Sequence, residues 1–134
     1  MFRVRLRLVS DNGDPAAVTG ATGIPPNRSF RAGETSTRTG KKYRFSQWSK
    51  SIGQESETDG IDDAIAEVCS WGLNTARSFR EICLSDNWEA SLVIIQEIRD
   101  ADDPHEKGIS LTSTAISWLA AAGASLEIDQ YLFV

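Results

Sequence analysis

Arginine side chains are the groups in this sequence best suited to binding a ligand. Arg28 and Arg31 lie three residues apart in a turn-rich segment, and Arg38 follows in the same segment. A guanidinium group binds a carboxylate or a phosphate through two parallel hydrogen bonds. Trp48 follows in the next predicted strand, and these four residues form one hypothesis, a site for a small anion. The alternative is that the arginines pair with acids of their own chain and that Trp48 packs in the core.

A second set of candidate residues is acidic and falls around the start of a predicted helix. The segment 55–67 contains six acids and no Lys or Arg, and a second acidic cluster follows at 100–106. An acidic surface speeds the encounter with a basic partner and adds specificity, which suits the binding of a basic toxin such as a nuclease. The alternative is a solvated helix start, where the helix dipole favours negative charge. The six acids are Glu55, Glu57, Asp59, Asp62, Asp63 and Glu67.

The residue types and spacings that support catalysis or metal binding do not occur together. His105 is the single histidine and lies in a predicted acidic surface turn, where a solvated role is expected. Gly33 and Gly40 are separated by six residues, whereas a phosphate-binding loop requires four between its glycines. Cys69 and Cys83 do not have the spacing of zinc ligands. We therefore predict a protein that is not an enzyme and uses neither a metal nor a cofactor.

The charge of the chain is divided between its two parts. Residues 1–54 contain ten Lys and Arg against three Asp and Glu, whereas residues 55–134 contain four against sixteen. Surfaces of opposite sign attract different partners, although the asymmetry itself names none. Nucleic acid is an unlikely partner because the net charge of the whole chain is −5.

Length and composition indicate one globular domain that spans residues 1–134. Hydrophobic residues make up 40% and charged residues 25% of the chain, which are ordinary values for a folded domain. We expect no membrane segment, because no apolar run approaches the roughly 18 residues that a span needs. A cytoplasmic location is expected by default, and a reducing compartment would keep both cysteines as thiols.

Hydrophobic periodicity and turn residues predict strands and helices in mixed order. The first strand has Phe2, Val4, Leu6 and Leu8 on one face. Asp14 before a proline is a helix-capping signal, and Asn74 is a second candidate cap. Leu111 and Ile116 have the spacing of a hydrophobic staple at the last helix. The predicted elements are strand 1–10, helix 14–22, an ordered loop or loose hairpin at 23–42, strand 43–52, helix 59–71, a second helix after Asn74, strand 88–99, helix 112–122 and strand 125–134.

These elements predict an α+β fold in two layers. We expect an antiparallel or mixed sheet of about five strands, with helices covering one face. Arg3, Arg5 and Arg7 then point to the uncovered face, where they would pair with Glu127 and Asp129 if the first and last strands are neighbours. The open face or an uncapped edge strand also allows a homodimer.

Short motifs near both ends of the chain resemble the bacterial domain-of-unknown-function 4279 family. That family has a glycine- and proline-containing turn after the first helix, then an Arg-x-Gly and a Trp-Ser pair, and a characteristic close around the last helix. The resemblance implies no activity, but it suggests small bacterial proteins of a kind often found beside toxins as immunity proteins. The matching segments are 22–26, 28–34, 45–49, 108–112 and 123–129 together with Tyr131.

Two hypotheses of function follow. In the first, this is a cytoplasmic immunity protein that neutralises a cognate bacterial toxin by direct binding through the acidic surface. In the second, it is a stand-alone module that binds a small anionic ligand through the region of Arg28, Arg31 and Trp48.

Overall fold

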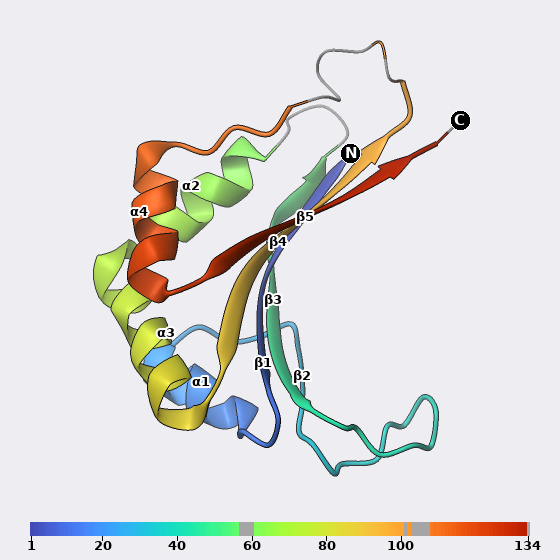
Figure 1. The fold of residues 1–134 in the computed structure, drawn as a ribbon, viewed down its shortest axis with the longest axis vertical. Coiled ribbons are helices and arrows are strands. Elements are labelled where there is room, and N and C mark those ends of the chain that lie inside the picture. The colour runs from blue at the N-terminus through green and yellow to red at the C-terminus, as the bar shows by residue number, and fades with distance from the viewer. Residues whose placement is uncertain (57–60, 101, 103–107, 134) are drawn as a thin grey trace.

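A computed structural model describes residues 1–56, 61–100, 102 and 108–133 of the chain. It contains five strands and four helices in the order β-α-β-β-α-α-β-α-β (Figure 1). The elements are β1 (Phe2–Ser10), α1 (Pro15–Thr22), β2 (Arg28–Phe30), β3 (Ser46–Ser56), α2 (Asp62–Ser70), α3 (Gly72–Asp86), β4 (Glu89–Ile98), α4 (Ser113–Ala122) and β5 (Ser125–Leu132).

The five strands form one mixed sheet in the order β2-β3-β1-β4-β5. The pairs β2–β3, β3–β1 and β1–β4 are antiparallel, whereas β4 and β5 are parallel. All four helices lie on one side of the sheet, and the other side is left open (Figure 1). The predicted two-layer α+β fold with a mixed sheet and helices on one face is therefore confirmed.

β1 lies at the centre of the sheet and has two chemically different faces. Phe2, Val4, Leu6 and Leu8 are buried on the helix side, as the strict alternation predicts. The arginines between them are half-buried on the open side. β1 therefore gives the sheet its apolar face and a row of arginines on its uncovered face.

Large aromatic side chains fill the space between the sheet and the helices. The Trp48 ring meets the Phe79 ring edge to face at 5.5 Å between centroids, and the Trp118 ring lies 6.0 Å from Phe79. Each of these three side chains is at most 1% exposed. The Trp118 Nε1–H donates a hydrogen bond of 3.1 Å to the Gly72 carbonyl oxygen, so the buried indole N–H of Trp118 is satisfied.

Several predicted boundaries change in the structure. The segment 23–42 is a loose hairpin with a short strand, β2, and an isolated bridge between Thr35 and Lys42. The predicted cap at Asn74 is wrong, because α3 begins at Gly72 with Trp71 in helical conformation before it and no side-chain cap. Ile116 remains 56% exposed at the predicted staple.

β3 has an irregular register against β1. Val4 pairs with Ile52 but Phe2 pairs with Ser56, so β3 contains extra residues between these pairs. Gly53 lies in this bulge with a φ of 70°, a conformation that favours glycine. A Cβ atom at this position would also lie 3.1 Å from Ala64 of α2, so the bulge fixes how closely that helix approaches the sheet.

Candidate functional site

Trp48 is a core residue, and the predicted ligand-binding role does not fit its position. The side chain has no exposed surface and lies on the helix side of β3, opposite Leu8 of β1. Its Nε1–H donates a hydrogen bond of 3.1 Å to Thr19 Oγ1 of α1. A ligand on the open face of the sheet cannot touch this ring, so Trp48 holds α1 against the sheet instead.

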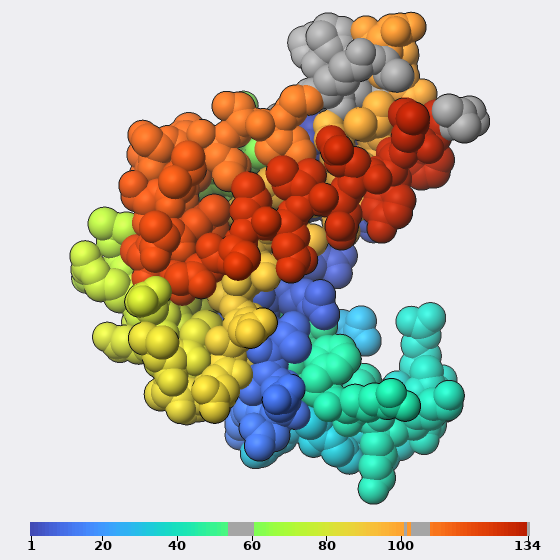
Figure 2. Space-filling view, viewed as in Figure 1, coloured from blue at the N-terminus to red at the C-terminus, as the bar shows by residue number. Residues whose placement is uncertain are grey.

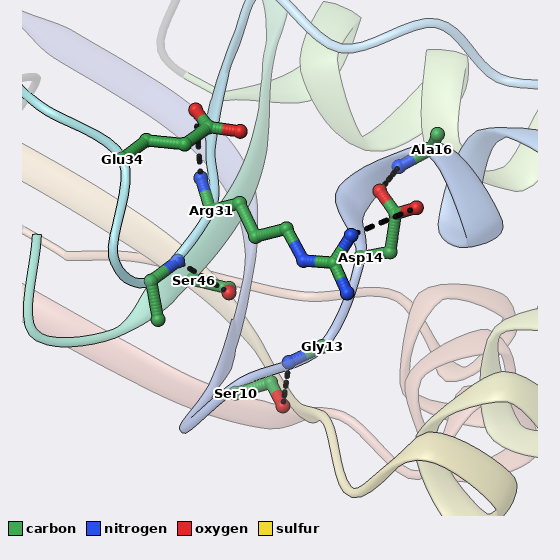
Figure 3. Close-up of polar contacts among 8 residues, drawn as sticks. Ser10, Gly13, Asp14, Ala16, Arg31, Glu34 and Ser46 are labelled. Atoms are coloured by element: carbon green, nitrogen blue, oxygen red, sulfur yellow. Dashed lines mark hydrogen bonds and ion pairs between the residues drawn. The ribbon is translucent and has the colours of Figure 1, made fainter.

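The three arginines predicted to bind an anion point to different places. Arg31 forms an ion pair with Asp14 at the start of α1, with 3.5 Å between Nη1 and Oδ2 (Figure 3). Arg28 lies over the Phe30 ring at 5.3 Å from its centroid, and it pairs in β2 with Ser49 of β3. Arg38 is exposed in the hairpin. The structure therefore does not bring Arg28, Arg31, Arg38 and Trp48 together into one site.

The described members of the acidic set lie at the start of α2. Asp62 and Asp63 are exposed in the first turn of this helix. Glu67 is half-buried, and its Oε2 accepts a hydrogen bond of 3.2 Å from the Gly53 backbone N–H. Glu67 therefore stabilises the bulge in β3. The backbone of Glu55 belongs to β3, and Glu57 and Asp59 lie outside the described residues.

The open face of the sheet carries a row of charged side chains on its central strand. Arg3 Nη2 donates a hydrogen bond to Glu97 Oε1 of β4 at 3.1 Å, and Arg7 Nε donates to Gln47 Oε1 of β3 at 3.2 Å. Arg5 lies between them in the middle of the central strand. No acid or hydrogen-bond acceptor pairs with its guanidinium among the residues that the structure describes. We name the row of Arg3, Arg5 and Arg7 the arginine row.

The arginine row covers the open face with its aliphatic stems. Val93 of β4 is the cross-strand neighbour of Arg5 and is only 5% exposed, although no helix lies over it. This burial requires neighbouring side chains above Val93, and long arginine stems can cover apolar surface while their charged ends remain in water. Arg5 is itself half-buried. Its stem thus lies against the sheet surface while its guanidinium remains accessible.

The hairpin of residues 31–45 extends the basic surface. It turns away from the helices, on the open side of the sheet (Figure 1). Figure 2 shows a hollow between this hairpin and the strands. Arg38, Lys41, Lys42 and Arg44 are exposed on the hairpin. Since potentials of one sign add up in a concave surface, this side of the molecule attracts anions.

Sequence alternation predicts the arginine row but not its partners. The predicted ion pairs with Glu127 and Asp129 are wrong, because β5 is separated from β1 by β4. Glu127 Oε1 instead accepts a hydrogen bond of 3.4 Å from Ser91 Oγ of β4, the strand that pairs with β5. Local alternation does not give the order of the strands. Because β4 lies between β1 and β5, Arg5 has no acid as a partner among the residues described.

These features define a class of protein, a small α+β domain whose uncovered sheet face carries a row of arginines on its central strand. In the described part of the chain, no three His, Cys, Asp or Glu side chains gather as metal ligands, and no helix is long and apolar enough to cross a membrane. The chain belongs to the DUF4279 family, a domain of unknown function, whose model matches residues 1–133. Neither the curated proteins nor the solved structures contain a match.

Proposed function

We propose that this protein is a non-catalytic binding domain that holds an anionic group on the open face of its sheet, with Arg5 as the central contact. The observation that carries this proposal is the Arg5 side chain in the middle of the open face, which is half-buried by its neighbours and whose guanidinium has no acid or acceptor among the described residues. An arginine without a partner in its own chain can bind a carboxylate or a phosphate through two hydrogen bonds.

The neighbours of Arg5 support this role. Arg3 and Arg7 are held by Glu97 and Gln47, so the two flanking side chains are already ordered before a ligand arrives. Ordered side chains lose less conformational entropy on binding. The remaining Nη atoms of the flanking residues add positive charge beside the Arg5 guanidinium.

The bound chemistry is a carboxylate or a phosphate, offered either by a small molecule or by an acidic segment of a protein. The open shape of the hollow in Figure 2 leaves room for both sources. Binding of inorganic phosphate alone would indicate a small anion, whereas binding of a short polyglutamate peptide alone would indicate an acidic protein segment.

Arg5→Met tests the proposal, because methionine keeps an apolar stem over Val93 and removes the charge. Titration calorimetry with inorganic phosphate and with the polyglutamate peptide should show binding to the wild type that is about 10- to 100-fold weaker in the variant, the effect of losing a charge-assisted hydrogen bond. Arg77→Met is the matched control, since Arg77 is exposed on α3 and donates to Asn74. The proposal fails if neither probe binds, or if the two variants bind alike.

A second candidate function is neutralisation of a basic toxin by the acidic surface at the start of α2. Asp62 and Asp63 support it, because both are exposed and neither has an ion-pair partner in the described structure. Such charges act mainly on the rate of association and on specificity. This function requires a cytoplasmic location. The free thiols of Cys69 and Cys83 are compatible with the reducing conditions of that compartment.

A pull-down against the products of the neighbouring genes, at low and moderate salt, tests the second candidate. We expect capture that weakens with salt and that falls about tenfold or more at low salt when Asp62 and Asp63 are both changed to Lys. Changing both Glu81 and Glu89 to Lys serves as the control, because it makes the same change of net charge at two other exposed positions. Undiminished capture by the double variant would show that the acidic surface at the start of α2 does not bind the toxin.

A further inference from the structure

The edge of the sheet at β5 is long and uncovered. All eight residues of β5 are exposed, and its pairing with β4 is regular over its whole length. β5 lies across the front of the molecule in Figure 2 with no other element over it. The opposite edge, β2, has only three residues. Proteins usually protect an edge strand by shortening it or by placing a bulge, a proline or lysines in it, and the sequence 125–134 contains no Pro, Lys or Arg.

Apolar side chains concentrate on this same edge. Five of the eight exposed large hydrophobic residues in the described structure lie between 126 and 133. Leu126, Ile128 and Leu132 point to the helix side, where the helix layer leaves them between 41% and 61% exposed. A cluster of this kind on a monomer marks an interaction surface.

The backbone of β5 has a free set of hydrogen-bonding groups. The Phe133 N–H donates to the Ile98 carbonyl oxygen at 2.9 Å, so the odd-numbered residues of this segment direct their backbone groups to β4. Backbone groups alternate sides along a strand, so the even-numbered residues direct theirs outward. Among the described residues nothing pairs with these outward groups, which belong to Leu126, Ile128, Gln130 and Leu132.

We propose that β5 pairs with β5 of a second copy of this chain, antiparallel across a twofold axis, so that two sheets join into one. Such an isologous contact uses the same edge twice and closes on itself, and β5 is the one described edge long enough to supply it. A second copy fits this edge, because an antiparallel register exists in which Glu127 and Asp129 do not face the acids of the partner and Ile128 meets Leu132.

The acids of β5 exclude two registers of this pairing. An axis at Ile128 places Glu127 opposite the partner's Asp129, and an axis at Asp129 places this carboxylate opposite itself. Both arrangements bring like charges together, which destabilises a cross-strand pair. An axis at Gln130 avoids this conflict, because Asp129 then faces the partner's Tyr131.

The register centred on Gln130 also pairs the apolar residues. Ile128 lies opposite the partner's Leu132, and the symmetry gives the same contact twice. Directly opposite side chains in an antiparallel pair have Cβ atoms about 4.5–5.5 Å apart, close enough to pack. The outward backbone groups of Ile128, Gln130 and Leu132 then form about six hydrogen bonds between the two copies.

The mass of the protein in solution tests the pairing. Sedimentation over a concentration series should show the wild type as a dimer and Ile128→Lys as a monomer, because a lysine on the edge blocks strand addition. Leu84→Lys is the matched control, since Leu84 is 69% exposed on α3, and it should remain a dimer. A monomeric wild type, a dimeric Ile128→Lys or an equal effect of both lysines would overturn the proposal.

Single cysteines at 128, 129 and 130 test the register. In the proposed register only residue 130 faces its own copy, at a Cα–Cα distance of about 5.5 Å, which a disulfide can span. Mild oxidation should therefore cross-link Gln130→Cys at least tenfold faster than Ile128→Cys or Asp129→Cys. The wild type, with Cys69 and Cys83, gives the background. Faster cross-linking at 128 or 129 would refute the register centred on Gln130.

Discussion

Cys83 shows how its surroundings change the chemistry of a single residue. The thiol lies on α3, half-buried against the core. Burial disfavours the charged thiolate and raises the pKa of Cys83 to about 11. The thiolate is the reactive form of cysteine, so this side chain is poorly suited to nucleophilic chemistry or to metal binding.

Thiol labelling tests this consequence. At pH 8 the Cys83 thiol should react with iodoacetamide about a hundredfold more slowly than a cysteine with a pKa of 9.0, because its thiolate fraction is lower by that factor. The rate should rise about tenfold per pH unit as the pH increases towards 11. Peptide mass spectrometry identifies the labelled residue, and the unfolded chain is the control. Equal rates for Cys83 in the folded and unfolded chain at pH 8 would contradict the effect of burial.

Trp48 and Arg5 mark the limit of sequence reasoning at the scale of the residue. Alternation places each residue on one of two faces of a strand, but in segment 43–52, where both faces carry aromatic residues, it does not say which face the helices cover. Trp48 falls on the covered face and packs on Phe79, which rules out contact with a ligand. Arg5 was predicted on the open face, and its lack of an acid depends on strand order, which is not a local property of the sequence.

At the scale of the element, α1 combines two polar contacts at its first turn. Asp14 Oδ1 accepts a hydrogen bond of 3.0 Å from the Ala16 N–H, and Oδ2 of the same carboxylate forms the ion pair with Arg31 (Figure 3). The side chains of the pair are 50% and 48% exposed, so solvent screens their attraction. The cap therefore contributes most of the stabilisation.

Two substitutions of Asp14 separate the cap from the ion pair. Asp14→Ala should lower the free energy of unfolding by about 1 kcal/mol, the usual cost of losing a helix cap, whereas Asp14→Asn keeps a capping oxygen and should lower it by less than about 0.5 kcal/mol. Urea unfolding measures both values, with Arg31→Ala as the control for the ion pair. If Asp14→Asn is as destabilising as Asp14→Ala, the ion pair is the main contribution.

Elements with local signals were predictable, and those that depend on distant contacts were less so. The cap at Asp14 and the left-handed Gly23 delimit α1 as predicted, with a φ of 72° at Gly23. Asn74 is also a good capping residue by type, but Trp71 is already helical, so α3 begins three residues earlier than predicted, at Gly72, and Asn74 does not cap it. The bulge at Gly53 depends on Glu67 and Ala64 of another element.

At the scale of the whole molecule, strand order gives the uneven charge of the sequence a spatial meaning. The basic first part of the chain supplies the central strand and the hairpin, so its positive charge is placed on the open side of the sheet. The exposed acids at the start of α2 belong to the helix layer. The fold class follows from periodicity, whereas the parallel pairing of β4 and β5 requires knowledge of the connection through α4.

The central place of β1 also has a consequence for how the protein is made. Its two neighbours, β3 and β4, come later in the sequence, and the Met1 amino group donates a hydrogen bond to the Glu97 carbonyl oxygen, 96 residues away. Contacts so distant in sequence slow folding. At roughly 5–20 residues per second, a ribosome adds the residues between β1 and the end of β4 in on the order of ten seconds. During that interval the nascent chain carries its most apolar strand face with no complete sheet to bury it.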